Sequence, residues 1–358
     1  MRIAVCWSNI SGYMAACWRE LAARPGVDLH VIAYRPSASL PTAFGEQTMA
    51  GVPHDLIDPE NQLTADWLTG RVAELEPDAV VVAGWLHPAY RAAITQRRLP
   101  GAYLMGLDLP WMGTLRQRAA PLALRAYFRQ IDRVLVCGER AWQYARRLGF
   151  AEAAITRGVY GIDYDGLAGA LDARTQHPDG WPKRFLFVGR YAEVKGVDLL
   201  TEGYRRYRAA HDDPWELVCC GRGPMGNTLT AETGVTDAGF VQPADLPGHM
   251  GGAGAFVLPA RYDPWPLVVV ESCAAGLPVL CSEACGSAVE NVRHLHSGYV
   301  FPTGSAEAVA DALSWAHASR ERLPEFGRRA RGFAAAYRTQ AWADRWEHAV
   351  NLAIAARA

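Results

Sequence analysis

The stretch RFLFVGRYAEVKGVDLL, residues 184–200, decides the fold that the sequence predicts. Its apolar start predicts a buried strand, and the helical pattern that begins at Gly196 predicts a helix. A strand that enters a helix through a glycine turn is one unit of a parallel α/β sheet. Free N–H groups at the start of such a helix favour an anion. The turn also holds two cations, so we predict a phosphate site at Gly189, Arg190 and Lys195.

Short apolar runs alternate with helical patterns along the whole chain of 358 residues. The runs are continuous, which is typical of parallel strands buried on both faces. We predict strands at 2–6, 29–34, 79–84, 133–137, 184–188, 216–220, 255–258 and 278–281. Helical patterns between them cover 12–23, 62–75, 138–148 and 196–210. This order predicts an α/β protein with doubly wound parallel sheets.

The chain divides near its middle. Residues 164–183 are polar, rich in Gly and Pro and without a strand pattern, and a new alternation begins directly after them. We therefore expect two Rossmann-like domains, 1–168 and 184–318, joined by a linker. The Arg-rich helices of 319–358 are expected to pack back onto the first domain. Ligands of such sheets bind at the carboxyl ends of strands, so the domains are expected to face an interdomain cleft.

Composition excludes several functional classes. The net charge of −1 gives no global field that would attract nucleic acid. No apolar stretch reaches the roughly 20 residues of a membrane span, and the N-terminal apolar run is too short for a signal peptide. We expect a cytoplasmic protein. The eight cysteines form no C-x-x-C pair, which favours buried free thiols over disulfides or a metal site.

A second stretch, RYDPWPLVVVESCAAG (261–276), places two acids beside an apolar run. Pro264 and Pro266 fit the entry to a helix, because proline is tolerated in the first turn. Asp263 precedes that helix, where it is either an ordinary N-cap or a ligand contact. Glu271 lies inside the apolar helix, where a buried carboxylate needs a partner such as a pair of ligand hydroxyls.

The stretch GRGPMG, residues 221–226, formally matches the dinucleotide fingerprint G-x-G-x-x-G. Pro224, however, suits the first turn of a helix, and the fingerprint is missing from the first strand, where it normally lies. Asp245 follows about 20 residues later, but not at a strand end. The alternatives are an NAD site of an oxidoreductase and a tight turn that lines a nucleotide cleft, and we favour the turn.

Four motifs in this order and spacing resemble the nucleotide-sugar half of the retaining glycosyltransferase family 4, which has the GT-B fold: GRYAEVKG, CGRGPM, AGFVQPADLPGHM and DPWPLVVVESCAAGLPVL. The resemblance implies transfer of a sugar from a nucleotide diphosphate sugar to an acceptor hydroxyl, in bacterial glycan, glycolipid or glycoconjugate synthesis. UDP is the family's commoner donor nucleotide, with GDP as the alternative. No cofactor and no essential metal are implied.

The resemblance implies a role for each matching residue. Arg190 and Lys195 hold the donor diphosphate, Glu271 accepts from the ribose hydroxyls, and Asp263 binds hydroxyls of the donor sugar. The implied catalytic residues are Arg190, Lys195, Asp263 and Asp108. The other implied donor contacts come from Gly12, Gly189, Val241, Pro264, Trp265, Pro266 and Leu267.

Two positions depart from the family pattern. Asp263 replaces the usual Glu, so its carboxylate reaches less far, and Leu107 replaces a His that often precedes Asp-Leu-Pro. Asp108 is a candidate for the acceptor hydroxyl or the developing positive charge on the sugar, with a loop cap before Pro110 as the alternative. His87 is a second acceptor candidate, although a lone loop histidine is usually structural.

Two alternatives concern the chemistry. Asp163-Tyr164-Asp165 matches the D-x-D pattern of metal-dependent transferases, but it lies at the predicted linker and is interpreted as a hinge. Two cations and a helix N-terminus can neutralise a leaving diphosphate without a metal. A non-catalytic nucleotide-sugar-binding protein is the remaining alternative to an enzyme.

Residues 109–131 contain no acid and mix arginines with large apolar side chains. Such a basic amphipathic segment fits an anionic membrane surface. The alternative, an ordinary and partly buried helix, is slightly favoured. Peripheral membrane contact is thus expected only as an addition to the nucleotide-sugar donor and a sugar, lipid-linked or small-molecule acceptor.

Overall fold

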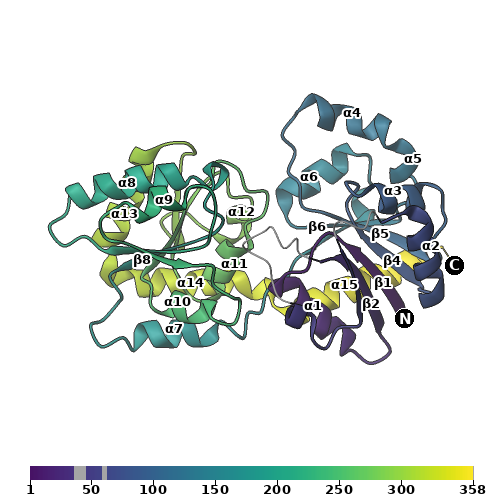
Figure 1. The fold of residues 1–358 in the computed structure, drawn as a ribbon, viewed down its shortest axis with the longest axis horizontal. Helices are drawn as coiled ribbons and strands as arrows, with labels where there is room; N and C mark the ends of the chain where they lie inside the picture. The colour runs from purple at the N-terminus through teal and green to yellow at the C-terminus, as the bar shows by residue number, and fades with distance from the viewer. Residues whose placement is uncertain (36–45, 59–62, 358) are drawn as a thin grey trace. The chain divides into compact units, whose positions relative to one another are not determined.

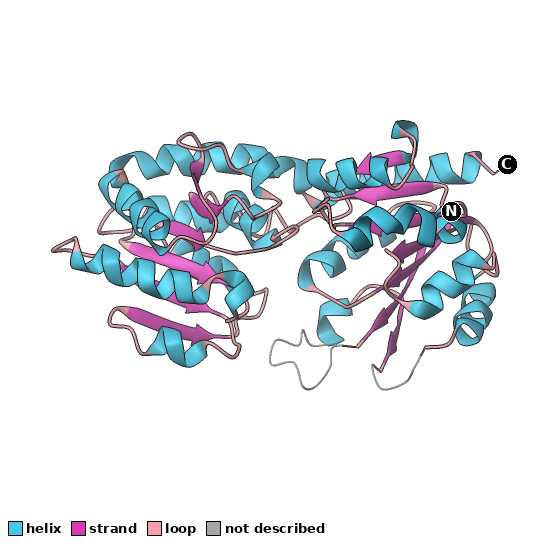
Figure 2. Ribbon diagram, turned by 90° about the horizontal axis from the view of Figure 1, so that it is seen from above, coloured by secondary structure: helices cyan, strands magenta, loops and turns pink. Residues whose placement is uncertain are grey.

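The computed structural model describes residues 1–35, 46–58 and 63–357. The chain folds as two compact units, and the first of them is built from two separate segments. Unit 1 comprises Met1–Ile162 and Thr339–Ala358, and unit 2 comprises Asp163–Arg338. Figures 1 and 2 show that helices cover both faces of a twisted sheet in each unit.

The described residues of unit 1 form a seven-stranded parallel sheet in the order β3-β2-β1-β4-β5-β6-β7. Its strands are β1 Arg2–Trp7, β2 Asp28–Tyr34, β3 His54–Ile57, β4 Ala79–Ala83, β5 Ala102–Leu107, β6 Arg133–Val136 and β7 Ile155–Arg157. The strand order reverses between the neighbours β1 and β4. At such a switch point the carboxyl ends of the strands leave a crevice for ligands.

The helices of unit 1 are α1 Gly12–Ala22, α2 Ala65–Leu75, α3 Pro88–Thr95, α4 Leu115–Ala123, α5 Arg125–Phe128, α6 Glu139–Arg147 and α15 Thr339–Ala355. The last of these, α15, packs against α1 (Figure 1). Its Trp342 and Trp346 are fully buried. Their Nε1–H groups donate to the carbonyls of Val159, at 3.0 Å, and Gly158, at 3.2 Å. These contacts bind the end of the chain to unit 1.

Unit 2 repeats the doubly wound arrangement with a six-stranded parallel sheet in the order β10-β9-β8-β11-β12-β13. Its strands are β8 Arg184–Val188, β9 Glu216–Cys220, β10 Val235–Gly239, β11 Ala255–Leu258, β12 Val279–Ser282 and β13 Gly298–Phe301. Its helices are α7 Ala168–Thr175, α8 Val197–Ala209, α9 Gly226–Thr230, α10 Leu246–Gly251, α11 Leu267–Ala274, α12 Ala288–Asn291, α13 Ala306–Ala318 and α14 Leu323–Ala334. The switch point lies between β8 and β11.

The segment 164–183 is not the plain linker that the sequence suggested, because it contains α7 and belongs to unit 2. Arg174 on α7 is fully buried and has no acidic partner among the described residues. Its guanidinium donates hydrogen bonds of 2.6 to 3.1 Å to the carbonyls of Met250, Ala253, Ala275 and Gly276. These carbonyls lie at and just beyond the C-terminal ends of α10 and α11, where backbone acceptors have no intrahelical partner. Arg174 therefore joins three helices.

The predicted fold class, two doubly wound parallel α/β units, is confirmed. Every predicted strand is present, and the eight cysteines are buried and free as expected. The strands that the sequence did not predict are β3, β5, β7, β10 and β13. Most of them are short, and β3, β7, β10 and β13 lie towards the sheet edges, where polar or half-buried residues weaken the apolar signal.

The boundaries of the two units also differ from those expected for the domains. Unit 1 ends at Ile162 rather than near 168, and the 319–358 region divides between the units. Helix α14 packs on α11 of unit 2, and α15 packs on unit 1. The division follows burial, since each helix lies against the sheet whose apolar face it covers.

Candidate functional site

The predicted phosphate turn lies at the switch point of unit 2. Gly189 and Arg190 follow β8 directly, and Lys195 ends a short 3-10 helix before α8. Gly196 has a φ of +72°, and a Cβ there would lie 1.9 Å from the carbonyl oxygen of Pro259. Glycine is therefore required for both the backbone conformation and the close approach. This contact brings the loops that follow β8 and β11 together.

Lys195 and Asp263 meet across this switch point as an ion pair, with 2.5 Å between Nζ and Oδ2. Asp263 is 7% exposed, whereas Arg190 is exposed and forms no ion pair with a described residue. An ammonium group has three donors. Lys195 can therefore hold Asp263 and still donate to phosphate oxygens, and Arg190 adds a second cation at the same strand end.

Asp263 is not the N-cap of the following helix, so that alternative is wrong. Helix α11 begins at Leu267, and no side chain caps it. The main chain instead fixes the loop, since the Gly286 N–H donates to the Asp263 carbonyl at 2.9 Å. A Cβ on Gly286 would lie 1.8 Å from the Pro264 carbonyl oxygen. The Asp263 carboxylate is thereby left to contact Lys195.

The loop residues expected to touch the donor are mostly packed. Trp265 and Leu267 are buried, and the Pro266 carbonyl accepts a hydrogen bond from Ser287 Oγ at 2.8 Å. Trp265 Nε1–H has no hydrogen-bond partner among the described residues. Val241 is half-buried in the loop after β10. Donor contacts by the backbone groups of these residues and of Pro264 stay predictions.

Glu271 lies in the second turn of α11 and is half-buried. No described cation pairs with its carboxylate. Burial, together with the negative charge of Asp163, raises the pKa of Glu271 to about 7. A carboxyl group with a raised pKa and no protein partner is typical of a functional position. Its predicted contact with ribose hydroxyls stays a prediction.

The GRGPMG loop is a tight turn, as we favoured. A Cβ on Gly221 would lie 1.9 Å from the carbonyl oxygen of Gly189, and a Cβ on Gly223 would lie 2.3 Å from that of Tyr191. These glycines thus allow close packing of the protein's own loops, a role that needs no dinucleotide. Pro224 does not begin a helix, because α9 starts only at Gly226.

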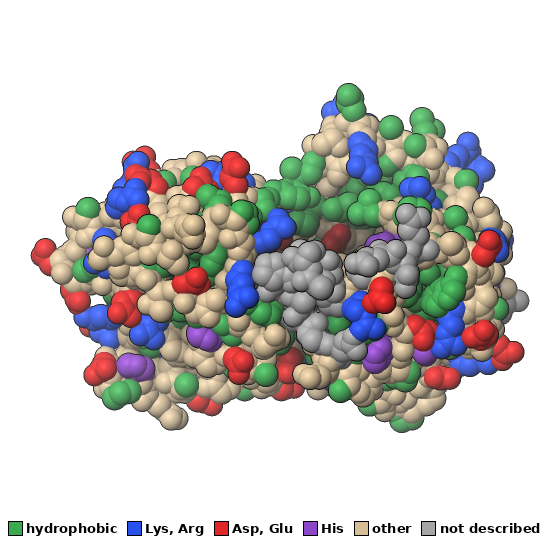
Figure 3. All heavy atoms as spheres, viewed as in Figure 1, with side chains coloured by type: hydrophobic (Ala, Val, Ile, Leu, Met, Phe, Trp, Pro, Cys, Tyr) green, Lys and Arg blue, Asp and Glu red, His purple; other side chains and the backbone are tan. Residues whose placement is uncertain are grey.

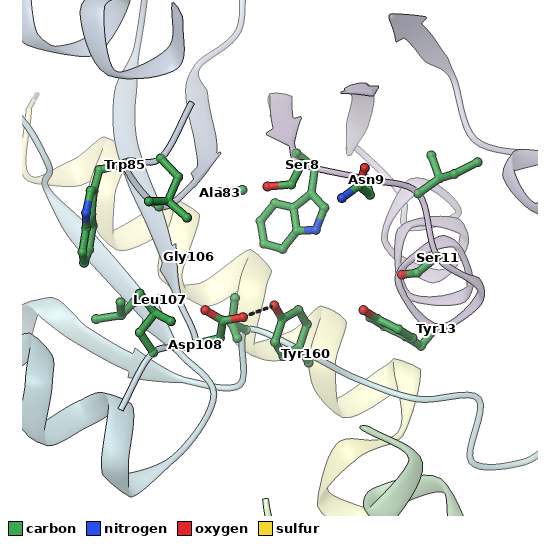
Figure 4. A pocket seen from close by; sticks show the side chains of 16 residues that line it. Ser8, Asn9, Ser11, Tyr13, Ala83, Trp85, Gly106, Leu107, Asp108 and Tyr160 are labelled. Atoms are coloured by element: carbon green, nitrogen blue, oxygen red, sulfur yellow. Dashed lines mark hydrogen bonds between the residues drawn. The ribbon is translucent and has the colours of Figure 1, made fainter. Parts of the chain in front are cut away.

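Unit 1 contains a pocket of about 440 Å³ at its own switch point. Its wall is formed by residues at and directly after the carboxyl ends of β1, β4 and β5, together with Val159 and Tyr160 (Figure 4). Gly12 is the first residue of α1, and its neighbours Ser11 and Tyr13 both line the pocket. The predicted glycine loop and Asp108 are therefore brought to one site.

The Asp108 carboxylate accepts a hydrogen bond of 2.9 Å from the Tyr160 hydroxyl, drawn as the dashed line in Figure 4. Burial and the negative charge of Asp108 raise the pKa of Tyr160, so its hydroxyl stays protonated and donates. Tyr13 packs edge-on against Tyr160, with 5.9 Å between the ring centres. The sequence did not indicate Tyr160, because it follows a three-residue strand that shows no clear pattern.

His87 occupies the N-cap position of α3 and does not line this pocket. Its Nε2 lies 2.8 Å from Ser8 Oγ, and its ring stacks on Tyr34 with 5.1 Å between centres. Burial lowers the pKa of His87, which favours the neutral imidazole. These contacts fit the structural alternative, and contact with an acceptor stays a prediction.

The described residues contain no group of three or more His, Cys, Asp or Glu side chains arranged to hold a metal ion. Asp163 and Asp165 lie where the chain passes from unit 1 to unit 2. Among the described helices, none combines the length and the apolar character that a bilayer span requires.

Part of the chain is similar to a known family. Residues 172–333 match the family model described as glycosyl transferases group 1. TuaC of Bacillus subtilis, a glycosyltransferase assigned to teichuronic acid biosynthesis, is 31% identical over 36% of this chain and 31% of its own length. A D-inositol 3-phosphate glycosyltransferase of Gordonia bronchialis is 28% identical over 47% of this chain and 38% of its own length. This chain thus spans less than half the length of these curated relatives.

Solved structures extend the likeness to the whole chain. A crystal structure of Anabaena HepE in complex with UDP matches with a TM-score of 0.73 and 16% identity, covering 97% of this chain and 99% of that one. The fold is GT-B. The match to the group 1 glycosyl transferase model lies entirely within unit 2, and the GT-B likeness includes unit 1 as well.

Proposed function

We propose that this chain is a retaining glycosyltransferase that moves a sugar from a nucleotide diphosphate sugar to an acceptor hydroxyl. A UDP-sugar is the favoured donor, because UDP occupies a solved GT-B relative. Synthesis of a bacterial glycan, glycolipid or glycoconjugate is the proposed setting, since TuaC is assigned to such a process. The observation that carries the proposal is the Lys195–Asp263 pair beside Arg190 at the switch point of the matched domain.

The proposed chemistry uses the protein's own charges. Arg190 and Lys195 stabilise the diphosphate as it leaves, and they do so without a metal ion. The bond between the sugar C1 and the phosphate oxygen breaks, and a bond from C1 to the acceptor oxygen forms on the same face. The acceptor proton passes to the departing phosphate oxygen. Asp263 holds donor-sugar hydroxyls, and Asp108 stabilises the acceptor hydroxyl or the positive charge that develops on the sugar.

The two lysines of the chain provide a matched test. Lys183 is exposed and pairs with the exposed Asp213, whereas Lys195 pairs with the buried Asp263. We expect Lys195→Ala to weaken UDP binding by roughly tenfold to a hundredfold, the range for a lost charge-assisted hydrogen bond. Lys183→Ala should leave binding unchanged.

Titration calorimetry with UDP and GDP measures these affinities, and an assay of UDP release from a panel of UDP-sugars tests the reaction. Equal affinity of the two alanine variants would show that the phosphate site is wrongly placed. Tight binding with no turnover of any donor would favour the non-catalytic sugar-nucleotide-binding alternative.

Peripheral contact with an anionic membrane is part of the same proposal. Three side chains of the 109–131 segment are strongly exposed: Met112 at 57%, Leu115 at 84% and Leu122 at 80%. Leu115 and Leu122 lie on α4 together with Arg116 and Arg118, and Met112 lies just before this helix. In Figure 3 hydrophobic and basic side chains lie together over the region of α4 and α5. Exposed leucines among arginines favour a surface of anionic lipid.

A further inference from the structure

The polar groups that line the pocket of unit 1 are almost all uncharged. Among the described residues that line it, Asp108 is the one charged side chain, and no Lys, Arg or His takes part. The remaining polar side chains of the wall are hydroxyl and amide groups, namely Ser8, Asn9, Ser11, Tyr13 and Tyr160. A ligand in this pocket therefore meets a carboxylate and neutral hydrogen-bonding groups.

Two basic side chains contact lining residues from outside the pocket and do not change this balance. Arg91 donates to the Trp85 carbonyl at 3.4 Å and is not part of the wall. His87 contacts Ser8 from outside the lining, and burial lowers the pKa of His87, which favours its neutral form. The N-terminus of α1 favours an anion, but in the proposed reaction it is used by the donor diphosphate near Gly12. A second anion would find no cation among the described residues that line the pocket.

Aromatic side chains give the pocket rigid walls. Trp7 and Tyr160 pack edge-on with 6.4 Å between ring centres, and Trp85 is fixed in the same way against Phe128 at 5.4 Å. Such rings pack well against the C–H faces of a sugar or cyclic polyol. Asp108 and the hydroxyl groups of the wall can accept or donate hydrogen bonds to its hydroxyls.

We propose that this pocket binds the part of the acceptor that carries the reacting hydroxyl, and that this part is an uncharged sugar or cyclic polyol without phosphate or carboxylate. The inference rests on the proposed glycosyl transfer, but a binding experiment can test it separately from that reaction. An anionic group placed here would lose its hydration and lie beside Asp108, and no cation among the described lining residues would compensate its charge. Specificity then comes from repulsion as well as from fit.

The experiment compares matched ligands on the full chain loaded with UDP, by saturation-transfer difference NMR. The pairs are glucose with glucose 6-phosphate, galactose with galacturonate, and myo-inositol with inositol 1-phosphate. We expect the neutral member of at least one pair to bind, with its charged partner at least roughly tenfold weaker, as like-charge repulsion in a poorly hydrated pocket predicts. Equal or tighter binding of the charged members, or no binding of any neutral ligand, overturns the proposal.

Two aspartate variants place the effect at the pocket. Asp108→Asn removes the charge and should reduce the preference for neutral ligands several-fold, by the repulsion that it relieves. Asp66→Asn is the matched control, because Asp66 lies exposed on α2 and pairs with Arg98. A preference unchanged in Asp108→Asn overturns the proposal. Failure of UDP to bind, with the neutral preference intact, would instead refute the proposed function alone.

Discussion

The Glu271 carboxyl has no cationic partner among the described residues, and burial and the charge of Asp163 raise its pKa to about 7 from 4.5. The folded protein therefore keeps a proton that the unfolded chain loses at lower pH. As a result, the contribution of Glu271 to the free energy of unfolding is most favourable below the pKa of 4.5 in the unfolded chain, and it falls as pH rises towards 7. A ribose that donates to the carboxylate reverses this preference, because it stabilises the ionised form.

We therefore expect donor affinity to rise with pH. UDP-glucose is a suitable probe, since its diphosphate diester does not titrate near neutral pH. Below a pKa of about 7 the ionised fraction falls roughly tenfold per pH unit. Calorimetry should show binding several-fold weaker at pH 6 than at pH 8. Glu271→Gln should bind weakly and with a flat pH profile, and a pH slope retained in that variant would contradict the assignment.

At the residue scale the sequence indicated most of the polar groups, but not their contacts. Lys195 was noted as one of two lysines, and Asp263 as an acid beside a helix start. Their ion pair joins residues 68 positions apart, and it depends on the close approach of two loops at Gly196. The contact between Tyr160 and Asp108 was missed because these residues are also distant in sequence. The order of the strands in the sheet brings them together.

At the scale of elements, Arg174 was the least predictable feature, because an arginine in a polar Gly/Pro-rich stretch indicates surface. Arg174 stabilises the fold because it donates hydrogen bonds to the carbonyls at the ends of α10 and α11. We expect Arg174→Met to lower the free energy of unfolding by roughly 3 kcal/mol or more, since buried acceptors lose charged donors. Urea denaturation measures this loss.

Arg174→Lys and Arg184→Met serve as controls for that experiment. Lysine keeps the charge but cannot present the planar fork to separate carbonyls, so it should restore only part of the stability. Arg184 is exposed and pairs with Glu216, and its loss should cost little. Equal effects at positions 174 and 184 would mean that Arg174 does not join the helices.

The helix α4 permits a direct test of membrane contact. Changing the exposed Leu115 and Leu122 to Gln removes apolar contact and preserves charge, whereas changing Arg116 and Arg118 to Gln does the reverse. Both pairs of changes should weaken sedimentation with phosphatidylglycerol vesicles. The arginine effect should disappear at high salt because surface charges are screened. Vesicle binding that neither pair alters, or none at low salt, would refute the contact.

At the scale of the whole molecule, the alternation of strands and helices was sufficient to predict two doubly wound units. The limits of those units were not predictable, because α15 is distant in sequence from the sheet that it covers. Its amphipathic pattern shows that it must be buried, but not against which unit. Trp342 and Trp346 decide this through their hydrogen bonds to the loop after β7.

This division predicts different behaviour for the isolated units. Residues 163–338 should fold cooperatively alone, because the segment is continuous and has its own core. Residues 1–162 alone should not, since they lack two buried tryptophans, each worth roughly 3–5 kcal/mol. Fusing 339–357 to the end of 1–162 through a Gly/Ser linker should restore folding. Thermal melts followed by circular dichroism test this, and a cooperative melt of 1–162 alone would contradict it.

The split of unit 1 also sets an order of assembly during translation. The ribosome delivers Asp163–Arg338 before the helix that completes the core around Trp7. Unit 2 can therefore fold on the nascent chain while unit 1 still lacks α15. A truncated chain that stops short of Thr339 contains an incomplete unit 1. The surface that the tryptophans of α15 normally cover is then exposed, and proteases and chaperones can recognise it. A segment that is synthesised after the whole of unit 2 thus decides whether unit 1 survives.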